Sequence, residues 1–366
     1  MSGRESKENR RRFLLRAAGA GALLGAGAAG GIVVHRQMPR ARAGRGVTAR
    51  LKPGRGYDLE ALAQVDPALI GYRRDLRFST GMKAARGLAV TEAGEVLVAG
   101  DHGYARFSAT GEALLAEPID DSARAVWWDS ESGAVWVAGE RRVYRFAATG
   151  GLEAQWPMPY EGAHARITSI ATSAGAVFLA IEERRRGHVL RCSMDGETAE
   201  PLFEPNPEEG VLPILSPSPY VDLGVTSEGH ILVGNLGQCQ VQLFSATGNL
   251  LAAWGRSSFA IDGFCGCCNP VCVAALPDGR VVTGEKGLKR VKIYRTSGEL
   301  DVVIAAPAEF SAAAQAGEPD PQKLKGLDVA VRSDGAVVVL DQTDATVHVM
   351  LPVTEADSEF QIVGRA

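Results

Sequence analysis

The strongest constraint on this chain is a sequence plan that recurs six times along it. Each copy reads as four short runs rich in β-forming residues, broken by tight turns at pairs such as Ala93-Gly94, Glu228-Gly229 and Asp334-Gly335. Glycine supplies the positive φ that hairpin turns need. A period of about 40 to 55 residues is typical of four-stranded blades arranged radially. The copies begin at Arg86, Arg124, Arg166, Tyr220, Pro270 and Lys325.

These copies resemble NHL repeats. The likeness is carried by GLAVTEAGEVLVAGD in the first copy, by GVTSEGHILVGN and VQLFSATGNLLAAWG in the fourth, and by LDVAVRSDGAVVVLDQTDATVHVM in the sixth. The resemblance implies an all-β fold, a six-bladed β-propeller with four antiparallel strands per blade. It implies little about function, because such propellers serve as binding platforms, lyases, lactonases and dehydrogenases.

The last copy lacks a fourth strand, since it contains only the β-rich runs 327–332, 336–341 and 346–351. We expect residues 72–79 to supply the missing outer strand and to close the ring, with residues 359–363 as a rival donor. Closure by distant parts of the chain removes an exposed sheet edge.

The N-terminus carries a second pattern. Residues 9–16 read NRRRFLLR, and an uncharged run rich in Ala and Gly follows over residues 17–34. This resembles a twin-arginine export signal, and Ala41-Arg42-Ala43 matches an A-x-A cleavage site. A membrane anchor is the alternative, because a run of about 18 residues is at the lower limit for a span. We therefore predict a signal peptide or anchor helix over residues 1–43, a linker over 44–69 and the propeller over 70–366.

The export signal predicts a periplasmic or otherwise extracytoplasmic propeller that contacts the membrane only through its N-terminal segment. The twin-arginine route moves folded proteins, often with a cofactor in place, so the resemblance favours a bound cofactor. The formal net charge is −4, and the basic leader makes the rest of the chain more acidic than that. No basic tract with interleaved aromatic residues follows the leader, so we expect no nucleic-acid partner. We expect a monomer.

Four of the six cysteines lie within eight residues and are the predicted metal ligands: Cys265, Cys267, Cys268 and Cys272. In a propeller, the first three fall in the loop that enters blade five, so we expect the group at one mouth of the central channel. Thiolates suit iron–sulfur clusters, copper and zinc. The adjacent Cys267 and Cys268 fit a cluster or a polynuclear copper site better than one small ion. We expect an iron–sulfur cluster or another thiolate-bound metal as the cofactor.

Charged residues are expected beside the thiols. The loop between the second and third strands of blade five contains Glu285, Lys286 and Arg290, which we assign to an outer shell around the metal. A basic residue also precedes the inner strand in four copies, and a ring of such residues would attract an anionic cofactor or partner. These residues are Arg86, Arg124, Arg166 and Lys325. The alternative is that they pair with acidic residues that follow the second strands, at Asp101, Glu140, Glu285 and Asp341.

Together these patterns predict a redox or electron-transfer role in the cell envelope, with an envelope redox or membrane protein as partner. One alternative is a non-enzymatic binding platform whose cysteines form structural disulfides, with Cys192 able to pair with Cys239. Thiol–disulfide exchange is another. The last is a calcium-dependent, lactonase-like hydrolase that uses Asn235, Glu285 and Asp341, in which case the protein is an enzyme.

Overall fold

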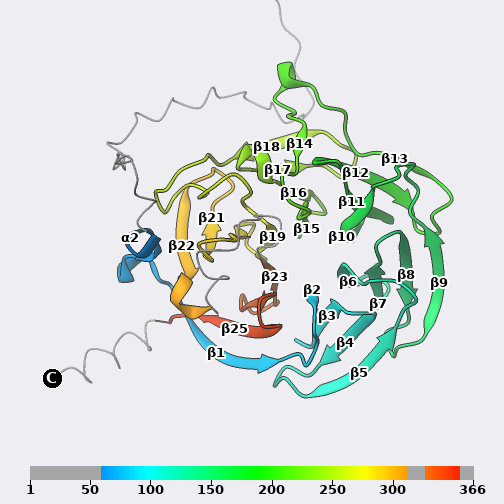
Figure 1. Ribbon diagram of the computed structural model, residues 1–366, viewed down its shortest axis with the longest axis horizontal. Helices are drawn as coiled ribbons and strands as arrows, with labels where there is room; N and C mark the ends of the chain where they lie inside the picture. Colours follow the sequence, from blue (N-terminus) through cyan, green and yellow to red (C-terminus); the bar gives the residue numbers. More distant parts are fainter. Residues whose placement is uncertain (1–58, 311–325, 355–366) are drawn as a thin grey trace, which may run out of the picture. The chain divides into compact units, whose positions relative to one another are not determined.

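The computed structural model describes residues 59–310 and 326–354, and these residues form six antiparallel sheets around a central axis (Figure 1). The innermost strands contact one another in a closed cycle, which passes through β2, β6, β10, β15, β19 and β23. The sequence-based prediction of an all-β, six-bladed propeller is therefore confirmed.

The first three blades follow the chain order from the axis outward. Blade one contains β2 (Ala85–Val90), β3 (Val96–Gly100), β4 (Gly103–Phe107) and β5 (Ala113–Pro118). Blade two contains β6 (Ala125–Asp129), β7 (Ala134–Ala138), β8 (Arg142–Phe146) and β9 (Leu152–Pro157). Blade three contains β10 (Arg166–Ser173), β11 (Ala176–Glu183), β12 (Arg186–Ser193) and β13 (Ala199–Pro201), and the short β14 (Ile214–Leu215) also pairs with β12.

The next two blades repeat this order. Blade four contains β15 (Leu223–Val225), β16 (Ile231–Asn235), β17 (Gln240–Phe244) and β18 (Leu250–Trp254). Blade five contains β19 (Cys272–Ala275), β20 (Val281–Gly284), β21 (Val291–Tyr294) and β22 (Leu300–Ala305).

Blade six closes the ring with a strand from the other end of the propeller. It contains β23 (Leu327–Val331), β24 (Val337–Asp341) and β25 (Thr346–Pro352). Its outer strand is β1 (Tyr72–Ser79), which pairs antiparallel with β25 from Tyr72 opposite Pro352 to Ser79 opposite Thr346. This is the closure predicted from the sequence. The rival donor, residues 359–363, lies outside the described residues.

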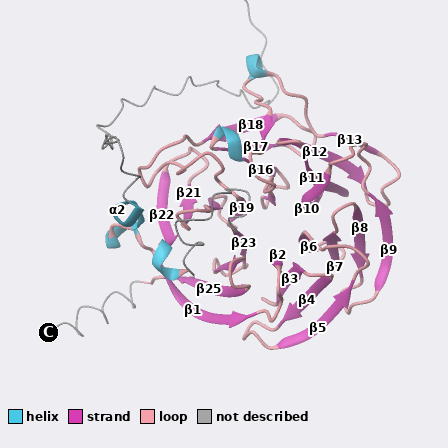
Figure 2. Cartoon of the chain, in the orientation of Figure 1, coloured by secondary structure: helices cyan, strands magenta, loops and turns pink. Residues whose placement is uncertain are grey.

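Short helical turns occur in the segments between the strands and before β1 (Figure 2). They are α2 (Leu59–Ala63), η1 (Pro67–Leu69), η2 (Pro207–Glu209), η3 (Leu236–Gln238) and η4 (Pro307–Glu309). In the part of the chain that the structure describes, no helix combines the length and apolar character that crossing a bilayer requires. The predicted signal or anchor segment, residues 1–43, falls outside that part.

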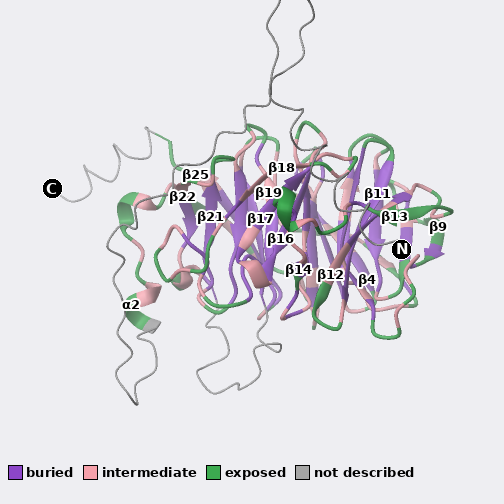
Figure 3. Ribbon diagram, turned by 90° about the horizontal axis from the view of Figure 1, so that it is seen from above, coloured by how far each residue is buried: buried purple, intermediate pink, exposed green. Residues whose placement is uncertain are grey.

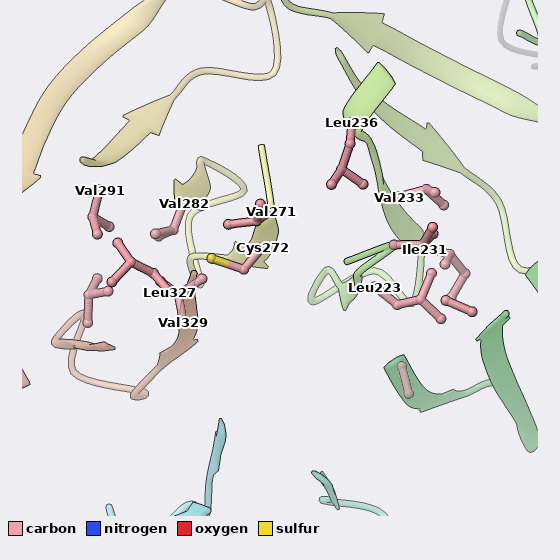
Figure 4. Packing of buried hydrophobic residues seen from close by; sticks show 14 of the residues in the cluster. Leu223, Ile231, Val233, Leu236, Val271, Cys272, Val282, Val291, Leu327 and Val329 are labelled. Carbon is pink, nitrogen blue, oxygen red and sulfur yellow. The ribbon is translucent and has the colours of Figure 1, made fainter. Parts of the chain in front are cut away.

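The glycine turns behave as the repeat pattern indicates. The turn glycines named from the sequence all have a positive φ: Gly94, Gly229 and Gly335. Exposed residues gather at the turns on the two rims and on outer strands such as β9, while the inner strands are largely buried (Figure 3). Hydrophobic side chains from neighbouring sheets interlock, and the largest such cluster joins blades three to six (Figure 4). Hydrophobic packing between neighbouring sheets therefore holds the blades around the axis.

Candidate functional site

Four of the six sulfur atoms gather on one rim of the propeller. Cys265, Cys267 and Cys268 lie in the loop between β18 and β19, as the repeat alignment predicts. Cys239 comes from the turn between β16 and β17, in the neighbouring blade, and its thiol donates to the Gly266 carbonyl at 3.4 Å. Burial raises the pKa of both Cys239 and Cys265, the Cys267 charge adds to the shift at Cys239, and the Cys239 charge adds to the shift at Cys265.

The thiols of this group differ in their access to solvent. The sulfur atoms of Cys267 and Cys268 lie 3.3 Å apart, with Cys267 exposed and Cys268 buried. Burial raises the pKa of Cys268, the hydrogen bond with Cys267 adds to this, and the Lys286 charge opposes it. The group therefore runs from a solvent-facing thiol at Cys267 to enclosed thiols at Cys268 and Cys239.

A buried ionic network supports the loop from below. The Glu285 carboxylate accepts a hydrogen bond from the Cys265 amide at 2.9 Å and one from the Arg290 guanidinium at 2.9 Å. Its second oxygen lies 2.7 Å from Lys292 Nζ. The Glu285, Arg290 and Lys292 side chains are at most 1 % exposed. Burial lowers the pKa of Lys292 to about 8, although Glu285 favours its charged form.

Asn269 ties the cysteine loop to the loop after β20. Its amide nitrogen donates to the Cys265 carbonyl at 2.6 Å and to the Lys286 carbonyl at 3.1 Å, and its oxygen accepts from the Lys286 amide at 2.8 Å. The Lys286 ammonium lies 5.2 Å from the centre of the Tyr220 ring, and Tyr220 lines the central channel. The thiol group therefore lies next to the channel mouth.

The structure separates Cys272 from this group. Cys272 is 1 % exposed and packs between blades five and six, with its sulfur directed toward Leu327 (Figure 4). Gly284 leaves room for that sulfur, because a Cβ there would clash with it. Burial raises the pKa of Cys272 well above its usual range. Cys272 is thus placed as a core residue rather than among the rim thiols.

Two alternatives from the sequence analysis were a Cys192–Cys239 disulfide and a calcium site at Asn235, Glu285 and Asp341. The side chains of both are engaged elsewhere in the structure. Cys192 and Cys239 belong to different hydrophobic clusters, so they are not brought together as a pair. Asn235 is fully buried and bonds to the Leu215 amide and the Pro213 carbonyl. Asp341 binds Lys289 at 2.6 Å. Over residues 59–310 and 326–354, no three His, Cys, Asp or Glu side chains form a group spaced to hold a metal ion.

Three of the four predicted basic residues do line the channel: Arg86, Arg124 and Arg166. Arg124 pairs with Glu140 at 2.8 Å and Arg166 pairs with Glu182 at 2.9 Å. Among the described residues, Arg86 has no carboxylate partner, and its hydrogen bond to the Ala123 carbonyl is long, at 3.5 Å. The fourth residue, Lys325, lies outside the described part of the chain.

The channel has a volume of about 570 Å³ and contains two carboxyl groups that the sequence analysis did not single out, those of Asp222 and Asp328. Asp222 accepts hydrogen bonds from the Ser169 hydroxyl and the Val273 amide, both at 2.8 Å. Asp328 accepts from the Leu88 amide at 2.7 Å. Burial raises the pKa of Asp222 to about 6 and that of Asp328 well above its usual range, and the Asp222 charge adds to the latter.

Comparison of the chain with protein-family models gave no match, and neither did comparison with curated protein sequences. Solved structures do match. A streptogramin B lyase is 13% identical, with the match covering 79% of this chain and 100% of the lyase at a TM-score of 0.51. The calcium-binding protein regucalcin from Agrobacterium tumefaciens is 14% identical, with the match covering 78% of this chain and 94% of regucalcin at a TM-score of 0.53. At these identities the likeness is one of fold, and it places the chain among the six-bladed β-propellers.

Proposed function

We propose that the rim thiols form a thiolate site that holds a soft metal, as an iron–sulfur cluster or a copper or zinc centre, and that the protein has a redox role. The ligands in this proposal are Cys239, Cys265, Cys267 and Cys268. The proposal keeps three of the four cysteines expected from the sequence and replaces Cys272 with Cys239.

One observation carries this proposal: Cys239, from a different blade, packs against the loop that carries the other three thiols. Thiols from two separate segments can surround a metal, whereas one short loop offers ligands from one side only. In the structure these side chains do not yet enclose a site. Rotation about the Cα–Cβ bond costs little for the exposed Cys267 and the half-buried Cys265, so a metal can draw their sulfur atoms inward.

The charge beneath the loop supports an anionic occupant. Arg290 and Lys292 are both buried, and the carboxylate that contacts them is Glu285. Burying two cations against one anion is unfavourable unless further negative charge lies nearby. The Asp262 carboxylate supplies some of that charge at Lys292, with a smaller effect than Glu285. Metal-bound thiolates supply negative charge, and the Cys265 amide already bonds to the same carboxylate. The ionic network would therefore stabilise thiolates in the loop and position Cys265.

In this proposal, electrons enter or leave the metal centre at the exposed Cys267. A partner that docks on this rim reaches Cys267 first, and the twin-arginine-like leader predicts that such a partner is an envelope redox or membrane protein. The proposed location is the periplasm or another extracytoplasmic compartment.

The test is metal analysis and visible spectroscopy of the full chain purified without oxygen. We expect about one bound centre per chain, with a thiolate-to-metal absorption band. Replacing Cys239 or Cys265 with serine is expected to remove most of the metal. Cys192→Ser and Cys272→Ala serve as matched controls, since these sulfur atoms lie in the hydrophobic core, and both are expected to retain it.

Two results would count against the proposal. Metal content that falls with Cys272→Ala but not with Cys239→Ser would show that the wrong fourth ligand was chosen. Metal-free protein with the rim cysteines paired in disulfides would instead support a non-enzymatic binding platform.

A further inference from the structure

The central channel carries opposite charges at two depths, and this arrangement is independent of the cysteines. Its mouth contains Arg86, Arg124 and Arg166, and its wall contains Asp222 and Asp328. Asp328 bonds to the amide of Leu88, which is two residues deeper along β2 than Arg86. With a rise of about 3.3 Å per strand residue, and a shift of register at Arg86, the two charged layers start at most about 6–7 Å apart along the strands.

The mouth has unbalanced positive charge. Glu140 and Glu182 neutralise Arg124 and Arg166, but Arg86 has no carboxylate partner among the residues described. Burial lowers the pKa of Arg86 and repulsion from Arg124 adds to this, while the more weakly acting charges of Asp101 and Glu140 oppose it. Nε of Arg124 is also buried without a hydrogen-bond partner. A carboxylate or phosphate at this point would relieve the repulsion and accept the free N–H groups.

The two aspartates carry charge that the fold does not need. Each accepts an amide N–H from the inner strand of the next blade, which helps to hold the blades together. Blade three makes the same contact with a neutral group, because the Ser169 hydroxyl accepts from the Leu223 amide at 3.2 Å. A serine therefore suffices for this structural task. Burial raises the pKa of both carboxyl groups, and the Asp222 charge raises that of Asp328 further, so ionisation of the pair is unfavourable in the empty channel.

A cationic group from a ligand would offset the cost of ionising Asp222 and Asp328. An ammonium group donates up to three hydrogen bonds and would stabilise both carboxylates in their ionised forms. The channel volume of about 570 Å³ lies within the range of small-molecule sites.

We propose that the channel binds a small zwitterion of the short-peptide class, with its carboxylate at Arg86 and Arg124 and its ammonium group between Asp222 and Asp328. The separation of the charged layers suits a carboxylate and an amine several bonds apart. The site goes beyond the thiolate proposal and does not depend on it.

The test is isothermal titration of the full chain with the dipeptide Ala-Leu, its N-acetyl derivative and its C-terminal amide. We expect saturable binding of Ala-Leu and at least tenfold weaker binding of each blocked form. Arg86→Gln and Asp328→Asn are expected to weaken Ala-Leu binding at least tenfold. Arg77→Gln is the matched control, since Arg77 lies on the outer strand β1 and pairs with Asp344 at 3.1 Å.

Thermal melts separate binding from folding. Asp328→Asn removes an ionisation that burial opposes, so its melting temperature is expected to equal or exceed that of the wild type while binding is lost. Cys239→Ser is expected to bind Ala-Leu as the wild type does, which separates this site from the thiolate site. Absence of Ala-Leu binding, equal binding of the blocked forms, or unchanged binding by both folded channel variants would overturn the proposal.

Discussion

At the scale of single residues, Glu285 connects the fold to the thiol loop. Its carboxylate contacts the Arg290 and Lys292 side chains and the Cys265 amide. The side chains of Glu285, Arg290 and Lys292 are all buried. The sequence analysis placed Glu285 and Arg290 beside the thiols but did not include Lys292. Lys292 lies within β21, where alternation gives no sign that a lysine points inward. Besides Glu285, the carbonyl groups of Ile261 and Gly263 accept hydrogen bonds from its ammonium group, which allows it to be buried.

Removing the Glu285 carboxylate is expected to be costly. Glu285→Ala leaves two buried cations without their counter-charge, so we expect a loss of about 3–5 kcal/mol in the free energy of unfolding. Urea denaturation of the full chain measures this. The exposed Glu299 in the same blade is the matched control, and Glu299→Ala is expected to change stability by less than about 0.5 kcal/mol. Equal effects of the two substitutions would contradict the role given to Glu285.

A second residue-scale feature is His348, a buried histidine in β25. Neither ring nitrogen has a hydrogen-bond partner, and the ring packs edge-on against Phe310. Burial, together with the charges of Arg77 and Arg74, lowers the pKa of His348 to about 4. The unfolded chain therefore binds a proton near pH 6.5 that the folded chain resists, so stability is lost as the pH falls from about 6.5 to 4.

His348→Leu is expected to remove this loss. At pH 7.5 the variant should be at least as stable as the wild type, because no hydrogen bond is broken and two buried, unpartnered ring nitrogens are removed. At pH 5 the difference should be larger by about 2 kcal/mol. Asp222 and Asp328 contribute with the opposite sign, since their raised pKa values favour the folded state as the pH falls. The measurement is therefore the difference between variant and wild type in urea at both pH values. His164→Leu, at an exposed histidine, controls for the added leucine, and a difference that does not change with pH would refute the assignment.

At the scale of elements, the pairing of the closing strand β1 with β25 joins strands that lie farther apart in sequence than any other paired strands described. The paired residues are more than 260 positions apart. The Tyr72 hydroxyl also donates to the Gly335 carbonyl, in the turn between β23 and β24, at 3.3 Å. The three-strand sixth copy was enough to predict that a strand was missing. The turn glycines likewise predicted the hairpins, because both signals are local in sequence. The extra pairing of β14 with β12 had no such signal and was not predicted.

Weakening β1 is expected to destabilise the whole propeller. Tyr72 is 7% exposed, so we expect Tyr72→Ala to lower the free energy of unfolding by about 3 kcal/mol. Leu114→Ala, on the exposed face of the outer strand β5, is expected to have little effect. Denaturation gives the energies, and hydrogen exchange should show faster exchange in β25 for Tyr72→Ala only. Unchanged protection of β25 would show that β1 is dispensable for closure.

At the scale of the whole molecule, the propeller brings loops from different blades to one rim. The repeat pattern predicted the fold, and the topology predicted which loop would carry Cys265, Cys267 and Cys268. It did not reveal that Cys239 joins them, because a repeat aligns residues within blades and gives no side-chain contacts between blades. Cys272 was grouped with the others by proximity in sequence, but strand direction turns its sulfur into the core. Asp222 and Asp328 were not predicted as channel residues, because the sequence pattern of the inner strands does not show which side chains face the channel.

The central claim is that sulfur atoms from two blades hold one metal centre. Native mass spectrometry of the full chain, purified without oxygen, tests it most directly. We predict a mass above that of the polypeptide by one metal centre, with the excess lost from Cys239→Ser and kept in Cys272→Ala. A mass equal to the polypeptide, or short by the hydrogen atoms of disulfides between the rim cysteines, would contradict the claim.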